Sequence, residues 1–462
     1  MTLNAERPGQ ADLLAVGFGT TVAMWAAAYV GRLPLVSLSP VVLFALFVAI
    51  MIAGGAAISR ATLRGVRGGA AVGLIAGLLN LLIIGSLLGG KDGRKLLPGD
   101  LATLAPVWIA GTLIAFALLG AAGAALFGRN PARATAPDAV WRHRFTTAAC
   151  GATLVVLVAG GVVTGFEAGL AVPDWPNSYG YNMFLFPLAK MTGGIYYEHA
   201  HRLAGSLVGL TMLVLAVYIQ RREPRVWVRV FAWILFVTVC GQGLLGALRV
   251  TGHLTLSDDP SVMAPNLTLA VIHGVLAQAF FAGLVCLRGV LSPEWSSADA
   301  AASRNQQRPA AATDRVLQIA AIGMLVIQLI LGAILRHFQE GMIIHISMAV
   351  IVTAVVAAVG IRAWGLYEDV PSLATLGGGL LILLGVQLAL GAAALLAVLY
   401  EAPAGEPHPI QVLLTTAHQS TGALLLAAAA LLLVLHMRLI RVMPTAPAPA
   451  SGPRGAQDAA TA

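Results

Sequence analysis

Long apolar runs alternate with short polar connections along most of the chain. A run of about 20 apolar residues is long enough to cross the hydrocarbon core of a bilayer as an α-helix. By this criterion we predict twelve membrane-spanning helices, at residues 13–31, 37–58, 69–90, 101–127, 145–165, 197–219, 227–249, 266–288, 315–336, 341–363, 374–400 and 411–436. The pattern therefore predicts an all-α polytopic membrane protein.

Two polar connections are longer than the others and divide the predicted helices into three sets of four. The first, GRNPARATAPDAVWRHR, follows the fourth helix, and the second covers 291–314. The divisions predict an N-terminal four-helix unit of unknown role over 1–130 and an eight-helix core. The core consists of two similar four-helix bundles, a first half over 145–290 and a second half over 315–440. The tail over 444–462 has no apolar surface to bury, and we expect it to be disordered.

Composition supports a membrane protein. Of the 462 residues, 58% are hydrophobic and only 10% are charged, with a mean hydropathy of +0.85. So few charges would not cover the surface of a soluble protein of this length. The three cysteines (Cys150, Cys240 and Cys286) lie in or beside apolar runs. This arrangement predicts neither a disulfide framework nor a cysteine metal site.

The net charge of +8 is distributed unevenly between the two sides of the predicted bundle. Most basic residues lie in connections on one side: Arg60, Arg64, Arg67, Arg129, Arg133, Arg142, Arg144, Arg221, Arg222, Arg225, Arg229, Arg304, Arg308, Arg315, Arg438 and Arg441. The positive-inside rule then places both termini in the cytoplasm, in a multi-pass protein of the cell (inner) membrane. The basic segment at 91–95 does not fit this rule. Arginines in short loops set orientation, so we do not expect nucleic-acid binding.

Four of the ten histidines occur at regular intervals. His201, His273, His345 and His418 are separated by 72, 72 and 73 residues. We place each in the first two turns of a helix that enters the membrane from the outer side, so all four have a similar depth. A single such histidine is best explained by one interhelical hydrogen bond. Four histidines at the same depth indicate that one structural unit is repeated along the chain, and that each repeat supplies one ligand.

A second pattern precedes three of these histidines. The sequence Q-x-x-x-G-A occurs at 242–247, 328–333 and 387–392, each one predicted helix earlier. Small residues allow neighbouring membrane helices to approach closely. We therefore interpret the helices with this pattern as packing partners of the helices that carry imidazoles.

The histidines favour heme over other metal groups. Zinc sites recruit several closely grouped ligands, whereas each half offers two histidines, no cysteine pair and few carboxylates. Two imidazoles facing each other across a bundle suit a flat macrocycle with two axial positions. The natural pairs are His201 with His273 and His345 with His418, near the outer face.

The two halves differ beside their first histidine. Glu198 precedes His201 by three residues and shares its helix face, whereas Met342 holds that position before His345. Glu198 either moves protons at a reactive heme or is a first-turn acid favoured by the helix dipole. Arg202 either holds a heme propionate or anchors the helix at the interface. We expect His199 and His253 to be solvated at the outer surface.

Five sequence motifs together resemble the heme A synthase family, the cytochrome oxidase assembly proteins of the Cox15/CtaA type. They are G-L-x-x-P-D-W-P at 169–176, E-x-x-H-R at 198–202, N-L-x-x-A-x-x-H at 266–273, L-G-A-x-x-R-H at 331–337 and H-Q-x-x-G-A-L-L at 418–425. The resemblance covers about 145–440 and none of the first 130 residues. It implies an eight-helix fold that oxidises the C8 methyl of heme O to the formyl of heme A.

The resemblance also implies roles for individual residues. His201 and His273 would hold heme O as substrate, His345 and His418 would ligate a heme b as cofactor, and Glu198 would be the acid at the reacting methyl. The implied partners are heme O, heme A and the lipid bilayer. A heme O synthase, a quinol or other electron donor, and a second copy of the chain are further candidates.

The chain departs from the family pattern in its first core helix and first outer loop. Many members carry an arginine shortly after a Gly-Gly pair that a glutamine precedes. Here Gly160-Gly161 is followed by Val162, and Val156 replaces the glutamine. A cysteine pair of many bacterial members is absent from the loop at 166–196. This absence puts a thiol step in doubt.

Two other classes of function remain as alternatives. One is a non-enzymatic di-heme membrane cytochrome b that passes electrons from quinol to a partner. The other is a transporter whose histidines relay protons. An electron carrier needs no acid beside one heme, so Glu198 favours the enzyme. A transporter usually has broken helices near the midplane, whereas these histidines lie towards the outer end.

Overall fold

The computed structural model describes residues 10–84, 105–128, 136–251, 266–296, 307–400 and 407–442. Within these ranges, twelve helices are long and apolar enough to span a membrane. This confirms the prediction of an all-α polytopic membrane protein. The predicted disordered tail and the segment 91–95 lie outside the described residues.

The chain forms three groups of helices in sequence order. The first group is α1 (Ala11–Gly31), α2 (Pro40–Ala61), α3 (Gly65–Ile84) and α4 (Ala105–Phe127). The second is α5 (Asp138–Gly165), α6 (Gly193–Arg222), α7 (Val226–Thr251) and α8 (Leu267–Val290), followed by the short α9 (Pro293–Ser296). The third is α11 (Ala311–Phe338), α12 (Met342–Leu366), α13 (Pro371–Leu399) and α14 (Pro409–Leu439).

Several helices are longer than their apolar runs. α5 begins at Asp138 instead of 145, and α6 spans Gly193–Arg222 instead of 197–219. The added turns contain charged and polar residues, which the hydropathy pattern could not assign to a helix. A stabilising acid, Asp138, lies in the first turn of α5, where the helix dipole favours negative charge.

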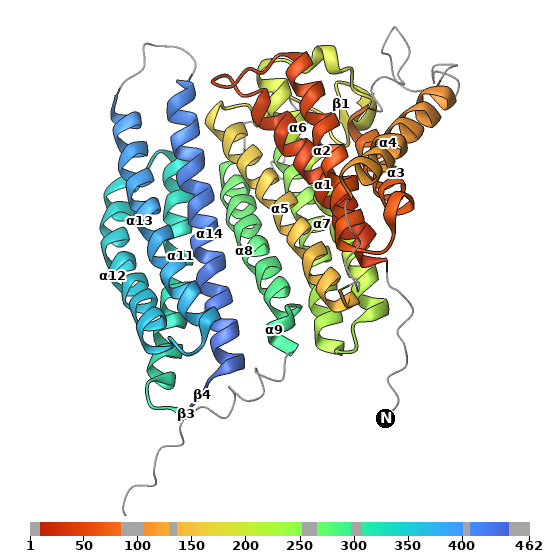
Figure 1. Cartoon of the computed structure of the whole chain (residues 1–462). Helices are drawn as coiled ribbons and strands as arrows, with labels where there is room; N and C mark the ends of the chain where they lie inside the picture. The colour runs from red at the N-terminus through yellow and green to blue at the C-terminus, as the bar shows by residue number, and fades with distance from the viewer. Residues whose placement is uncertain are drawn as a thin grey trace, which may run out of the picture.

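The second and third groups each form a closed ring of four helices. In each ring the helices pack in sequence order, and the last also packs on the first. α14 joins the rings by packing on α8 and α5, and α11 also contacts α8. Figure 1 shows the third group at one side of the molecule and the second group in the centre.

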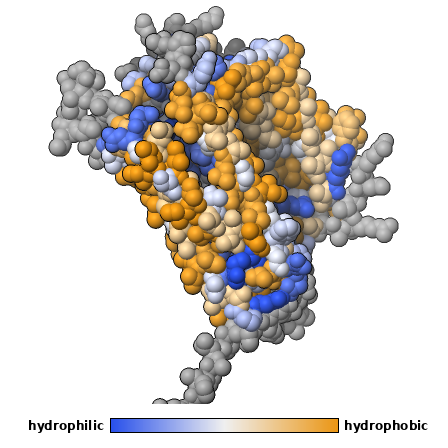
Figure 2. Space-filling model, turned by 90° about the vertical axis from the view of Figure 1, so that its left-hand side faces the viewer, coloured by the Kyte–Doolittle hydropathy of each residue, from blue (hydrophilic) through white to orange (hydrophobic). Residues whose placement is uncertain are grey.

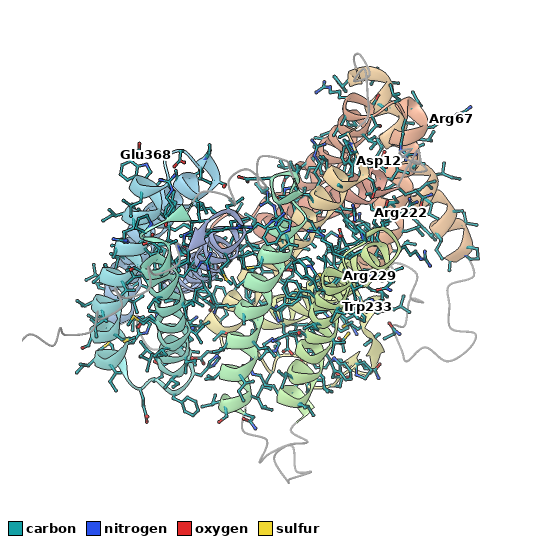
Figure 3. The ribbon with its side chains drawn as sticks, turned by 90° about the horizontal axis from the view of Figure 1, so that it is seen from below. Asp12, Arg67, Arg222, Arg229, Trp233 and Glu368 are labelled. Atoms are coloured by element: carbon teal, nitrogen blue, oxygen red, sulfur yellow. The ribbon has the colours of Figure 1, made fainter. Side chains whose placement is uncertain are left out.

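The first group, α1–α4, lies on the side of α5 that faces away from α14 (Figure 1). α1 packs along α5. Polar contacts connect α1 to α6, to α3 and to Arg64, which precedes α3. Tyr218 on α6 accepts from the Ala11 amide at 3.1 Å and donates to Asp138 at 2.6 Å. Trp25 on α1 donates to Asn80 on α3 at 3.2 Å. Asp12 on α1, labelled in Figure 3, pairs with Arg64 at 2.5 Å.

Two pairs of short strands complete the described structure. β1 (Asn177–Ser178) and β2 (Tyr181–Asn182) form an antiparallel hairpin in the connection between α5 and α6. The 3-10 turns η2 (Met183–Leu185) and η3 (Leu188–Lys190) follow it. β3 (Gln307–Arg308) pairs in parallel with β4 (Arg441–Val442) at the opposite end of the core.

The surface has the distribution expected for a bilayer environment. Figure 2 shows the face formed by the third group of helices, with apolar side chains over its middle and hydrophilic ones towards its ends. Exposed apolar residues on this face include Val350 and Ile382, which are 69% and 70% exposed. Large exposed apolar surfaces are rare on soluble monomers, so lipid is their natural contact.

Close glycine contacts join α4 to its neighbours, and they generate a test of the N-terminal unit. A Cβ added to Gly120 would collide with the backbone of Gly69, whereas one added to Gly111, on the same helix, would meet nothing within 4 Å. Overpacking costs about 1–3 kcal/mol. Gly120→Val should therefore lower the thermal unfolding midpoint of the purified protein, and Gly111→Val should leave it unchanged. Equal midpoints for the two variants would contradict this packing.

Candidate functional site

The four regularly spaced histidines come from helices that begin at one end of the core, here called the histidine end: α6, α8, α12 and α14. His201 and His418 are in the third turn of their helices, not in the first two as predicted, because α6 begins at Gly193 and α14 at Pro409. His273 and His345 are within the first two turns.

The structure brings the histidines together as two pairs. The ring centroids of His201 and His273 are 6.3 Å apart, and those of His345 and His418 are 6.4 Å apart. The interplanar angles are 74° and 82°. Metal–imidazole bonds are about 2.0 Å long, so two rings on opposite sides of one metal have centroids about 6 Å apart. The spacing in both halves fits a single metal between two imidazoles.

A glycine on the preceding helix lies against each histidine. A Cβ added to Gly160, Gly332 or Gly391 would lie 3.0, 3.0 or 2.9 Å from Cε1 of His201, His345 or His418, respectively. For Gly246 and His273 the distance is 3.8 Å. The sequence pattern had suggested that these small residues serve the approach of two helices. The structure shows that they also leave space for the imidazole rings.

The residue one turn before each glycine faces the same ring in three of the four cases. Gln328 Nε2 lies 3.2 Å from Nδ1 of His345, and His418 Nδ1 lies 3.2 Å from the carbonyl oxygen of Gln387. With its amide oriented to satisfy both side-chain atoms, Gln242 donates to His273 Nδ1 at 2.8 Å. The contact between His418 Nδ1 and the Gln387 carbonyl is the kind by which a histidine ligand donates its other ring N–H and is held in orientation.

The His201 position lacks this amide because Val156 occupies it. Nδ1 of His201 is buried beside the Val156 backbone, in the same arrangement as His418 Nδ1 beside the Gln387 carbonyl. The side-chain oxygens of Gln328 and Gln387 are also buried and unpartnered, so the second half offers hydrogen-bond acceptors beside its imidazoles.

Glu198 is buried at the first pair and is held in a fixed position. Its carboxylate accepts from the Val172 amide at 2.7 Å and pairs with Arg202 at 2.6 Å. Arg202 also donates to the carbonyl oxygens of Val172, Asp174 and Asn177 at 2.5, 2.6 and 3.1 Å. The Glu198–Arg202 pair thus ties the connection between α5 and α6 to the α6 helix that carries His201. A role of Arg202 in binding a propionate stays a prediction.

The same connection covers His199, which we had expected to be solvated. His199 is only 1% exposed, lies 3.1 Å from the Ser178 hydroxyl and packs on the Phe186 ring. The expectation was wrong because hydropathy could not reveal that the β1–β2 hairpin folds back onto α6. His253 lies outside the described residues.

Two arginines that the sequence analysis did not single out stand near the histidine pairs. Arg249, in the last turn of α7, interacts electrostatically with Glu198 and His273. Arg336, in the last turn of α11, interacts with Glu167. No ion pair within 4 Å is found for either in the described part of the chain. Each follows a Q-x-x-x-G-A segment, at 242–247 and 328–333, and this shared place was the signal available in the sequence.

Among the described residues of the second half, none corresponds to Glu198. Met342 begins α12 and is 38% exposed. Over the described ranges, no group of three or more histidine, cysteine, aspartate or glutamate side chains could hold a metal ion. A metal bound by either histidine pair would need further ligands from another source, and a macrocycle supplies them.

Comparison with known proteins finds a family model that is similar to part of this chain. The COX15-CtaA family model, described as cytochrome oxidase assembly protein, matches residues 179–344. This confirms the resemblance to the heme A synthase family. The matched segment includes Glu198, His201, Arg202 and His273 and ends one residue before His345. No match was found among curated proteins.

The contacts of Arg202 generate a test of how the α5–α6 connection is held. Breaking a buried ion pair costs about 3–5 kcal/mol, and Arg202→Gln also removes bonds to the connection itself. We expect proteases to cut within 166–192 several-fold faster in this variant. Arg221→Gln, at the exposed far end of α6, is the control and should behave like wild type. Unchanged cleavage in Arg202→Gln would show that the connection is held by other contacts.

Proposed function

We propose that the protein is a membrane oxidoreductase of cytochrome oxidase assembly that converts heme O to heme A. The observation that carries this proposal is the asymmetry between two otherwise similar histidine pairs. Only the first pair has a buried carboxylate, Glu198, on the same helix. The match to the cytochrome oxidase assembly family supports the same function.

The two histidine pairs fit heme iron as axial ligands. Each pair has a ring separation that suits one metal, and the described residues offer two protein ligands at each. Porphyrin iron brings four nitrogen ligands of its own and takes one axial ligand on each side. We infer that His201 and His273 hold the substrate heme O, and that His345 and His418 hold a heme b.

Glu198 is suited to handle protons at the reacting methyl. Converting a methyl to a formyl group with an oxygen atom from water releases protons and electrons, so the reaction needs a proton-accepting group near the methyl and an external electron acceptor. The Glu198 carboxylate is fixed by Arg202 and the Val172 amide, which orient its oxygens. General acid–base groups of this kind contribute about 10²–10⁴-fold to rate.

The residues of the second half are suited to holding a heme without reacting with it. His345 and His418 contact the amides of Gln328 and Gln387, and the described residues place no carboxylate beside them. A bound heme b there would supply one-electron transfer. Arg249 and Arg336, for which no ion pair is found among the described residues, are candidates to bind heme carboxylates, in addition to the predicted Arg202.

The main alternative is a di-heme cytochrome b that carries electrons without changing heme. It shares all four ligands with the enzyme and differs in what happens to the first heme. Glu198 distinguishes the two, because an electron carrier has no proton to remove from a heme methyl.

Replacing Glu198 tests the proposed reaction. In cells that make heme O but lack another source of heme A, the wild-type protein should produce heme A, measured by extraction and chromatography. Glu198→Gln should lower heme A by roughly 10²-fold or more and keep the bound heme, seen as an unchanged Soret band. Glu340→Gln, at an exposed position of the histidine end, is the matched control.

The outcomes separate the functions. Heme bound normally by wild type, with no heme A formed, would favour the electron carrier. A wild-type preparation without a Soret band would exclude both heme functions and leave the transporter. Heme A at wild-type level in Glu198→Gln would remove the proposed role of this residue.

The glycines behind the imidazoles give a second test, specific for the cofactor site. Gly332→Val would push into the His345 ring, whereas Gly323→Val, on the same helix, would meet open space. Overpacking by about 1–3 kcal/mol should weaken heme binding in the second half roughly 5- to 150-fold. We expect Gly332→Val to lose the same b-type absorption signal as His345→Ala, and Gly323→Val to keep it. Retention of this signal in Gly332→Val would place the heme elsewhere.

A further inference from the structure

The α1–α4 unit, whose role the sequence left open, contacts the core on elements of the first half. α1 packs on α5 and α6, and α3 packs on α6 and on η2, the turn that follows the β1–β2 hairpin (Figure 1). α6 carries Glu198 and His201, and the α5–α6 connection supplies the amide that binds the Glu198 carboxylate. The unit therefore lies beside the elements that hold the groups of the first site.

A row of aromatic rings links the end of α1 to the start of α6 and the end of α5. The Tyr29 ring of α1 stacks on Tyr196 of α6, with centroids 6.0 Å apart. Tyr196 meets Tyr197 edge to face at 5.5 Å, and Tyr197 stacks at 4.6 Å on Phe166, the residue that follows α5. Tyr29 is only 6% exposed, and its carbonyl oxygen accepts from the Tyr196 hydroxyl at 3.4 Å. The first turn of α6 is thus held between α1 and the end of α5.

This first turn leads directly into the first site. Glu198 follows Tyr197 in the sequence, and His201 lies one turn beyond Tyr197 on the same face of α6. A hydrogen-bonded helix moves as a unit over so short a distance, so a shift of the first turn also moves the carboxylate and the imidazole. Misplacement of reacting groups by about 1 Å can lower a rate roughly 10²-fold. The contacts of Tyr196 and Tyr197 therefore bear on the position of Glu198.

A second contact of the unit reaches His199, which follows Glu198. Met183 of η2 packs on the apolar cluster that contains Leu79 of α3. The buried His199 ring lies beside the Met183 backbone and 3.1 Å from the Ser178 hydroxyl. α3 thus supports the α5–α6 connection from outside, while His199 supports it from α6.

We propose that the α1–α4 unit is a brace that positions Glu198 at the first histidine pair, with Tyr29 as its main positioning residue. This inference rests on the proposed function, in which Glu198 must stand at the reacting methyl. The second half needs no such brace, because α12 follows α11 after a short turn that fixes its start. In the first half, the long connection over 166–192 leaves the start of α6 dependent on contacts of this kind.

Hydrogen exchange of the full-length protein tests the brace, because the Val172 amide donates to Glu198 and exchanges only when that bond opens. Tyr29→Leu removes the ring pair, and exchange within 166–199 should become roughly fivefold faster. Tyr29→Phe should keep the wild-type rate, because the Tyr29 hydroxyl has no hydrogen-bond partner among the described residues.

Phe18→Leu is the matched control on the same helix. It removes the aromatic pair that Phe18 of α1 makes with Phe145 of α5, with centroids 5.1 Å apart. Phe18 lies about 16 Å along α1 from Tyr29. Exchange within 166–199 should therefore remain as in wild type.

The same variants separate positioning from stability. Under the conditions given for Glu198→Gln, heme A formed per bound heme should fall roughly tenfold in Tyr29→Leu. The b-type signal of the His345–His418 pair should stay unchanged. Tyr29→Phe and Phe18→Leu should match wild type in both measurements. If Tyr29→Leu does not fold, Tyr196→Leu removes the same ring pair from α6 and should give the same result.

Other results would overturn the brace. A wild-type exchange rate in Tyr29→Leu would show that the connection is held without α1. Faster exchange with a wild-type level of heme A would show that Glu198 keeps its place without the brace. Equal losses in Tyr29→Leu and Phe18→Leu would indicate general destabilisation. If the wild-type protein forms no heme A, the proposed function fails, and the exchange rates alone then decide whether the unit braces α6.

Discussion

Room for four imidazole rings between closely packed helices is the constraint on which the core depends. Each ring lies on one helix of a pair, and a glycine of the preceding helix leaves the space that the ring occupies. A larger residue at Gly160, Gly332 or Gly391 would displace the ring or separate the helices. The regular spacing of histidines along the chain follows from this unit, because each repeat must supply one glycine-bearing and one histidine-bearing helix.

The two halves share these imidazoles and glycines but differ in the connections and side chains near them. In the first half, the connection from α5 to α6 folds back onto α6 and is fixed by Glu198 and Arg202. In the second half, α11 and α12 are joined by a short turn, and Met342 stands where the first half has its acid. The described part of one half therefore combines imidazoles with a buried carboxylate and one amide, while that of the other places an amide beside each imidazole. Such a division suits a site of reaction beside a site of electron transfer.

The two ends of the core have different physical characters. The histidine end buries polar groups beneath a folded connection, whereas the opposite end gathers arginines and tryptophans around a cavity between the halves. α14 takes part in both, since His418 is near its beginning and Arg438 near its end. The α1–α4 unit packs on the opposite side of α5 and leaves both histidine pairs to the eight core helices.

The sequence by itself determined the number of spanning helices and the regular placement of His201, His273, His345 and His418. Both depend on periodic patterns within single helices, which hydropathy and spacing record directly. It did not reveal that His199 is buried, that α6 and α14 begin early enough to place their histidines in the third turn, or that Arg142, Arg225 and Arg438 surround one cavity. These features depend on contacts between segments distant along the chain, and only the tertiary structure decides which polar groups lose water together.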